Sequence, residues 1–110
     1  MNSHFQHRSL AEGRWYTLSL VEQLGHIGSE VSRAIRARED KKKYQGAVWR
    51  ALELFDLTIS DPRWRNRLKE ICRAREVFCD TAVGENQYRT TLEDLNRYFY
   101  YFAFAARAKK

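Results

Sequence analysis

The sequence predicts an all-α protein, and more specifically an antiparallel up-down-up-down four-helix bundle. The 110 residues include one proline and five glycines, so few positions interrupt a helix. Four segments repeat apolar residues at three- and four-residue steps, as one face of an amphipathic helix does. The connections between these segments are short, and short connections place consecutive helices side by side in opposite directions.

The first helix is expected at residues 16–37. Its apolar stripe consists of Leu20, Leu24, Ile27, Val31 and Ile35. Gly25 and Gly28 lie inside this helix, where small residues let a neighbouring helix approach closely. The charged stretch 38–43 contains no apolar residue, and we therefore expect an exposed loop there.

The second helix is expected at residues 44–59. Its inward stripe consists of Tyr44, Val48, Ala51, Leu52, Phe55 and Ile59. Leu54 and Leu57 widen this stripe, which predicts contacts with more than one neighbouring helix. Trp49 lies off the stripe and is expected to be partly exposed.

The third helix is expected at residues 62–83, because Asp61 can cap a helix whose first residue is Pro62. Gly84 is expected to end it. The inward stripe consists of Trp64, Leu68, Ile71, Cys72, Phe78 and Ala82. Cys72 and Cys79 lie two helical turns apart, too far for a disulfide, so both are interpreted as small buried residues of a reducing compartment.

The fourth helix is expected at residues 91–106, with Thr90 and Glu93 forming a capping box. Leu92, Leu95, Phe99, Phe102 and Ala106 form its inward stripe. The helix is apolar on nearly every side, although one bundle core covers only one face. Residues outside the stripe are therefore predicted to form an oligomer interface, and they are Tyr98, Tyr101, Phe104 and Ala105. In the alternative, the N-terminal arm folds back through Phe5 and Trp15 and covers them within one subunit.

The chain contains no internal repeat and no domain boundary, so residues 15–110 are expected to form one bundle domain. Residues 1–14 are polar and are expected to form a flexible arm, and the basic tail 107–110 is expected to fray. No apolar run is long enough to span a membrane, and the arm lacks the apolar stretch of a signal peptide. We therefore expect a cytoplasmic protein with no membrane partner.

The basic balance of the chain favours a polyanionic partner. The formal net charge is +6 and the pI is near 9.6. Helical angles place four cations of the third helix on one side, and they are predicted to bind nucleic-acid phosphates: Arg63, Arg65, Lys69 and Arg73. Further candidates are Arg33, Arg36, Lys41, Lys42 and Lys43.

A solvated surface accounts equally well for the basic residues of the third helix. In that alternative, these residues pair with acids such as Glu70 and Glu76. Arg75 falls near the apolar stripe, and it could pair with Glu53 or Asp56 inside the bundle.

The sequence holds no pattern typical of an enzyme. Glu-x-x-His metal spacing, Gly-rich phosphate loops and nucleophile motifs are all missing from it. His26 follows Glu22 by four residues without a second histidine, and we interpret it as a surface or hydrogen-bonded residue. No catalytic residue, metal or cofactor is predicted. A protein–protein adaptor or assembly scaffold remains a rival to nucleic-acid binding.

Several segments resemble the bacterial four helix bundle protein family. They are WYTLSLVEQLG at 15–25, GSEVSRA at 28–34, RALELFDLTI at 50–59, RLKE at 67–70, REV at 75–77 and YFYYFAFAAR at 98–107. The family includes proteins encoded in intervening sequences of large-subunit ribosomal RNA genes. It is also similar to the accessory variability determinant (Avd) of diversity-generating retroelements.

The resemblance implies a homopentamer of four-helix subunits that binds RNA or DNA without base specificity. It further implies association with a reverse transcriptase in mutagenic retrohoming. The expected function is therefore that of a non-enzymatic retroelement accessory protein. The alternatives are an adaptor or scaffold, or a ribosomal RNA intervening-sequence protein of unassigned role. The matching segments are mostly packing patterns, so the predicted phosphate contacts rest on charge alone.

Overall fold

The computed structural model describes residues 13–108, and every regular element in this range is helical. The elements are η1 (Arg14–Thr17), α2 (Leu20–Arg36), α3 (Lys41–Ile59), η2 (Pro62–Arg67), α4 (Leu68–Val83) and α5 (Leu92–Ala108), where η denotes a 3-10 helix. The all-α prediction is confirmed. Phe5 and residues 109–110 lie outside the described range, as do the side chains of Ala105 and Ala106.

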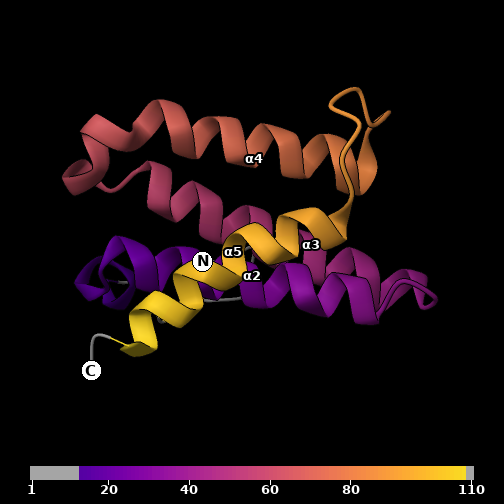
Figure 1. Ribbon diagram of the computed structural model, residues 1–110, viewed down its shortest axis with the longest axis horizontal. Coiled ribbons are helices and arrows are strands. Elements are labelled where there is room, and N and C mark those ends of the chain that lie inside the picture. The colour runs from indigo at the N-terminus through magenta and orange to yellow at the C-terminus, as the bar shows by residue number, and fades with distance from the viewer. Residues whose placement is uncertain (1–12, 109–110) are drawn as a thin grey trace, which may run out of the picture.

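Helix α2 lies at the centre of the arrangement. It packs most extensively against α5 and α3, whereas α4 packs mainly against α3 and touches α5 only lightly. Figure 1 shows α5 crossing over α2 and diverging from α4 towards its C-terminal end. Consequently α4 is the helix that its neighbours cover least. Of its residues, only Ile71 and Phe78 are buried.

The core centres on three aromatic rings from three helices. Phe55 of α3 contacts Phe78 of α4 and Phe99 of α5, with ring centroids 5.9 Å apart in both pairs. All three side chains are fully buried, and each was expected on an inward stripe. Burial of large apolar side chains such as these is the main stabilising contribution to a small domain.

Gly28 sets how closely α5 approaches α2. A Cβ atom at this position would lie 2.5 Å from Cβ of Phe99, closer than two carbon atoms can approach. The prediction that a small residue here permits a close helix crossing is therefore confirmed. On α3, Trp49 is exposed, as its position off the stripe predicts.

The first predicted helix is interrupted before α2. The hydroxyl of Ser19 accepts a hydrogen bond from the backbone N–H of Glu22 at 3.2 Å, and the Glu22 carboxylate accepts one from the Ser19 N–H at 2.8 Å. This capping box starts a new helix at Leu20, so the prediction of one helix from residue 16 is wrong. The preceding Arg14–Thr17 is a separate 3-10 turn.

The predicted loop 38–43 is shorter than expected, because Asp40 caps α3. Its carboxylate accepts a hydrogen bond from the Lys43 backbone N–H at 3.2 Å, and the helix begins at Lys41. The three consecutive lysines therefore form the first turn of α3 rather than a loop.

The cap at Asp61 is confirmed, with Pro62 in the first turn that follows it. The prediction of one α-helix over 62–83 is wrong, because Pro62–Arg67 is a 3-10 helix and α4 begins at Leu68. Trp64 leaves the helical conformation (φ −102°, ψ 23°), and its indole N–H donates to Gln23 Oε1 at 3.0 Å. The helical angles that grouped Arg63 and Arg65 with Lys69 and Arg73 therefore do not apply across this break.

The capping box predicted for the last helix is replaced by a single cap bond one residue later. The hydroxyl of Thr91, not of Thr90, accepts from the backbone N–H of Asp94 at 3.0 Å. Glu93 instead pairs with Arg38 of the α2–α3 connection at 2.8 Å. Helix α5 accordingly begins at Leu92 and extends to Ala108, beyond the predicted end.

Both cysteines are free thiols, as their spacing predicts. The expectation that both are buried is wrong for Cys72, which is exposed, while Cys79 is half-buried. Leu68 of the same predicted stripe is also exposed. The reason is the divergence of α5, which leaves part of the apolar side of α4 uncovered. Gly84 ends α4 in an extended conformation.

Candidate nucleic-acid interface

Cationic side chains gather where α2 ends and α3 begins. Arg33 and Arg36 come from the last turn of α2, Lys42 and Lys43 from the first turn of α3, and Arg50 from further along α3. They line one hollow of about 550 Å³, which we call the lysine hollow. Glu39 and Asp40 also line it.

A buried carboxylate holds two of these cations in place. The Glu30 side chain is 4% exposed and pairs with Arg33 at 2.7 Å and with Arg50 at 3.2 Å. One carboxylate between two guanidinium groups leaves excess positive charge at the surface. Because Arg50 and Glu30 lie on different helices, the ion pair also fastens α3 to α2.

Arg36, Lys42 and Lys43 form no ion pair with any residue in the range 13–108. The two lysines also occupy the N-terminal turn of a helix, where the macrodipole and unbonded N–H groups already produce positive potential. Cations in this position oppose helix stability, so folding does not explain them. They do strengthen an anion-attracting field.

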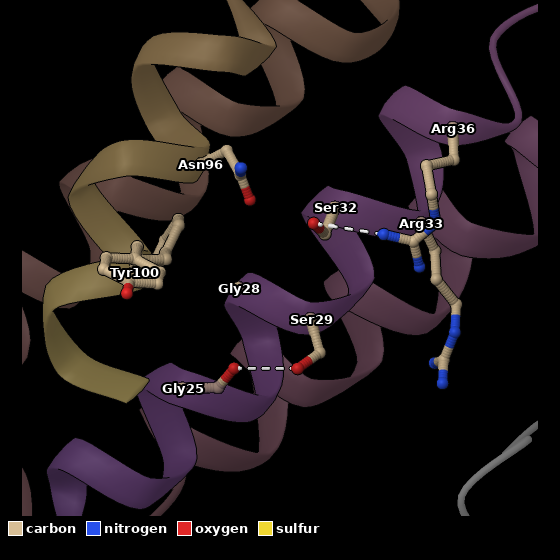
Figure 2. Close-up of a pocket in the computed structure, with 9 residues that line it drawn as sticks. Gly25, Gly28, Ser29, Ser32, Arg33, Arg36, Asn96 and Tyr100 are labelled. Atoms are coloured by element: carbon tan, nitrogen blue, oxygen red, sulfur yellow. Dashed lines mark hydrogen bonds between the residues drawn. The ribbon is translucent and has the colours of Figure 1, made fainter. Parts of the chain in front are cut away.

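A second hollow, which we call the tyrosine hollow, lies between α2 and α5 (Figure 2). Its volume is about 320 Å³, and its lining includes Ser29, Ser32, Arg33, Arg36, Asn96 and Tyr100. The Arg36 guanidinium donates to the Ser32 hydroxyl at 3.4 Å, and Ser29 donates to the Gly25 carbonyl at 3.3 Å (Figure 2). Arg33 and Arg36 line both hollows, which therefore adjoin.

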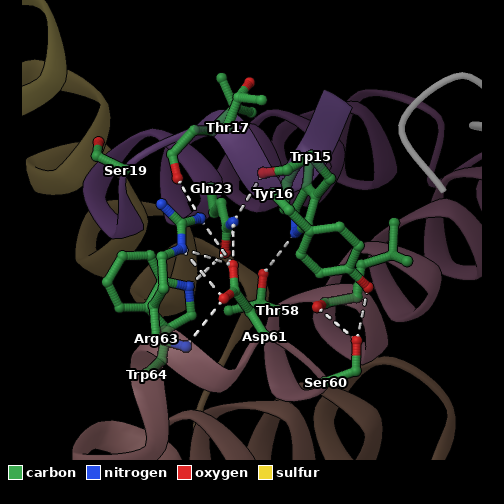
Figure 3. A network of polar contacts seen from close by, with 12 residues as sticks. Trp15, Tyr16, Thr17, Ser19, Gln23, Thr58, Ser60, Asp61, Arg63 and Trp64 are labelled. Atoms are coloured by element: carbon green, nitrogen blue, oxygen red, sulfur yellow. Dashed lines mark hydrogen bonds and ion pairs between the residues drawn. The ribbon is translucent and has the colours of Figure 1, made fainter. Parts of the chain in front are cut away.

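Arg63, a predicted phosphate ligand, is engaged within the fold (Figure 3). Its guanidinium donates to Asp61 Oδ2 at 2.7 Å and to the Leu18 carbonyl at 2.7 Å, and it lies over the Trp64 ring. These side-chain hydrogen bonds lower the pKa of Asp61 and raise the pKa of Arg63. The arginine is thus a structural partner of a buried carboxylate.

The network around Arg63 connects the start of α2 to the turn between α3 and η2 (Figure 3). Gln23 is fully buried and donates to the Trp15 carbonyl at 2.9 Å and to Asp61 at 3.2 Å. The Trp15 indole donates to the Thr58 hydroxyl at 3.1 Å. Every buried polar side chain named here has a partner, as expected of a network that specifies structure.

Arg65, Lys69 and Arg73 are exposed and form no ion pair with residues 13–108. Arg73 lies over the Tyr88 ring at 5.2 Å. The solvated-surface alternative holds for Arg67, which pairs with Glu70 at 2.8 Å. In contrast to the cations of the lysine hollow, Arg65 and Lys69 line neither that hollow nor the tyrosine hollow.

Some of the other sequence predictions about charged residues are confirmed and others are wrong. Arg75 pairs with Asp56 at 2.8 Å, one of the two partners considered, but at the surface rather than inside the bundle. Glu76 accepts a hydrogen bond from the Tyr88 hydroxyl at 2.7 Å instead of pairing with a basic residue. Lys41 is exposed and does not line the lysine hollow.

The predicted interface residues on α5 lie at the surface. Tyr101 is 71% exposed, Phe104 is 56% exposed and Tyr98 is 39% exposed. Trp15 does not cover them, because its ring is fully buried and bonded to Thr58. Tyr98 also lines an apolar groove of about 300 Å³ between α4 and α5, together with Ala74, Val77 and Leu95.

Sequence reasoning missed Arg50, Asn96 and Tyr100, which the fold brings to the hollows. Tyr100 was recognisable as one of the aromatic residues off the inward stripe, although nothing in the sequence placed it in the same hollow as Arg36. Arg50 had no local signal, because its partner Glu30 lies twenty residues earlier on another helix.

Across residues 13–108, no helix is both long and apolar enough to cross a membrane. The same range contains no group of three or more His, Cys, Asp or Glu side chains placed to hold a metal ion. His26 lies at the surface, with its ring centroid 5.7 Å from that of Trp15.

Comparison of the chain with family models, curated proteins and solved structures finds no match. The family resemblance, the partners and the function therefore stay predictions.

Proposed function

We propose that this protein is a non-enzymatic, oligomeric nucleic-acid-binding protein that holds the phosphate backbone at the two adjoining hollows. The observation that supports this most directly is the gathering of Arg33, Arg36, Lys42, Lys43 and Arg50 around the end of α2. Arginine and lysine contacts to phosphates provide affinity without base readout. Arg65, Lys69 and Arg73 become secondary candidates, because neither the lysine hollow nor the tyrosine hollow brings them together.

The triple variant Arg36→Ala, Lys42→Ala, Lys43→Ala tests the phosphate contacts. None of these side chains is buried or ion-paired within residues 13–108, so the fold is expected to persist. We expect weaker RNA and DNA binding, and a plot of log affinity against log salt whose slope falls by about 2 to 3. Fluorescence anisotropy with labelled oligonucleotides across a salt series measures both quantities.

The matched control is Arg65→Ala, Lys69→Ala, Arg73→Ala, which removes the same charge from η2 and α4. We expect it to retain most of the affinity. An equal loss in both variants would assign binding to net charge rather than to the hollows. If the unmodified protein bound no polynucleotide at low salt, the proposed function would be wrong.

We propose that α5 joins copies of the chain through Tyr98, Tyr101, Phe104 and Ala105, and the resemblance favours a pentamer. The support is the exposed aromatic area, because a patch this apolar is rarely left open to water. Tyr101→Glu is expected to reduce the assembly to smaller species, since it places a charge at the contact. Native mass spectrometry measures the change. Trp49→Glu on α3 is the control, because Trp49 is also exposed but lies on another helix.

The family resemblance supports the further proposal of an accessory role in mutagenic retrohoming, with a reverse transcriptase as partner. It also supports an up-down-up-down arrangement of the four helices and a cytoplasmic location. Neighbouring genes provide a direct test. A reverse transcriptase gene with template and variable repeats would favour this role, whereas a ribosomal RNA operon would favour the intervening-sequence alternative. An adaptor or scaffold role would follow if oligomers form without nucleic-acid binding.

A further inference from the structure

We propose that the tyrosine hollow takes one unpaired base of a single-stranded nucleic acid. The base stacks on Tyr100 and Arg36 binds the adjoining phosphate, while Arg33, which stays paired with Glu30, adds positive charge to the same hollow. This inference rests on the proposed function and deepens it, because it specifies the strand state of the ligand. Only an unpaired base offers its face to a side chain, since the bases of a duplex stack on one another.

The Tyr100 ring is available for stacking. It is 56% exposed, and among residues 13–108 its ring contacts are with two exposed neighbours on α5: Tyr101, edge-on with centroids 6.4 Å apart, and Phe104, nearly parallel with centroids 6.5 Å apart. It lines the hollow instead of packing into the core. Figure 2 shows it on α5 across from the serines and Arg36 of α2. A planar ring and guanidinium groups in one hollow are the combination that single-strand binding sites use.

The polar groups of the hollow suit a base edge and its phosphate. The Asn96 amide forms no hydrogen bond with residues 13–108, and an amide both donates and accepts. Asn96 and Tyr100 lie one turn apart on the same face of α5. Among the described residues, the Arg36 guanidinium is held by one long contact, 3.4 Å to Ser32, so it can turn to a phosphate.

The size and charge of the hollow favour a nucleotide over a second copy of this chain. Its volume of about 320 Å³ lies at the lower end of small-ligand pockets. A second copy seated here would have to bring a carboxylate to Arg36, which has no carboxylate partner within residues 13–108. A phosphate neutralises the guanidinium directly.

The test compares Tyr100→Leu, Tyr100→Phe and Trp49→Leu. Trp49 is the control, because it is an exposed aromatic residue that lies on α3, outside the proposed oligomer interface, and does not line the hollow. Binding is measured by anisotropy with a single-stranded oligonucleotide and with a duplex of equal length. The oligomer size of each variant is measured alongside.

We expect Tyr100→Leu to weaken single-strand binding about tenfold with little change for the duplex. Tyr100→Phe should retain binding, because the ring stacks without its hydroxyl, and Trp49→Leu should leave both affinities unchanged. If Tyr100→Leu instead alters oligomer size, the surface is a subunit contact and the inference is wrong. Equal effects on single strand and duplex would also overturn it, while leaving phosphate binding intact. A protein that binds neither form would contradict the proposed function itself.

Discussion

Replacing Asp61 with alanine is expected to lower the free energy of unfolding by about 3 kcal/mol, because it removes a buried carboxylate that pairs with Arg63 and caps η2. The Asp61 side chain is 1% exposed. It accepts hydrogen bonds from the Arg63 backbone N–H at 3.0 Å, from the Arg63 guanidinium and from the Gln23 amide (Figure 3). Without the carboxylate, η2 loses its cap and Arg63 loses its counterion. Urea unfolding followed by circular dichroism measures the loss, which should appear as a lower midpoint.

The control is Asp56→Ala, which removes an exposed carboxylate paired with Arg75. A pair at the surface contributes little, so we expect a change below about 1 kcal/mol. Comparable losses in the two variants would show that the buried Asp61 contributes no more to stability than an exposed carboxylate does.

The same ion pair makes the stability of the fold depend on pH. Hydrogen bonds from Arg63 lower the pKa of Asp61 in the folded protein relative to the unfolded chain. The stabilisation is therefore complete above the ordinary aspartate pKa near 4 and is lost as the pH falls through the lower folded value. In Asp61→Asn, stability should fall less steeply with acid over that interval. Parallel acid profiles for the two proteins would contradict this assignment.

Substituting Gly28 with alanine is expected to destabilise the protein by about 3 kcal/mol, at the upper end of the cost of overpacking. The added methyl group would lie 2.5 Å from Cβ of Phe99, an atom next to the backbone that no rotamer change can move. Helix α5 must therefore shift away from α2. Thermal unfolding and the urea midpoint both measure the effect.

Gly46→Ala is the matched control, because Gly46 also lies inside a helix. There the nearest atom to the new methyl group is the flexible end of Arg50, at 3.4 Å. Alanine is the better helix former by about 1 kcal/mol, so this variant should be neutral or more stable. If Gly28→Ala were equally tolerated, the close crossing of α2 and α5 would be wrong.

Features that depend on residues close together in the chain were largely readable from the sequence. The cap at Asp61, the end of a helix at Gly84 and the inward positions of Phe55, Phe78 and Phe99 all follow from local spacing. The capping boxes show the limit of such reasoning. Ser19 and Glu22 have the spacing of a capping box, but the longer apolar pattern led us to start the helix earlier. At the last helix, Thr90 and Thr91 could each serve as the N-cap, and the structure uses Thr91.

By itself, the sequence determined helical content, most of the core positions and a cationic surface, because periodicity, capping and charge involve residues within a few turns. Tertiary structure decided which cations meet. Arg50 reaches Glu30 only because α3 packs on α2, and Tyr100 and Arg36 line one hollow only because α5 crosses α2 at Gly28. Likewise, the sequence predicted Arg63 to be a phosphate ligand, but the 3-10 conformation of η2 places it against Asp61, with which it pairs. Such contacts depend on crossing geometry, which side-chain packing across helices sets and local sequence does not encode.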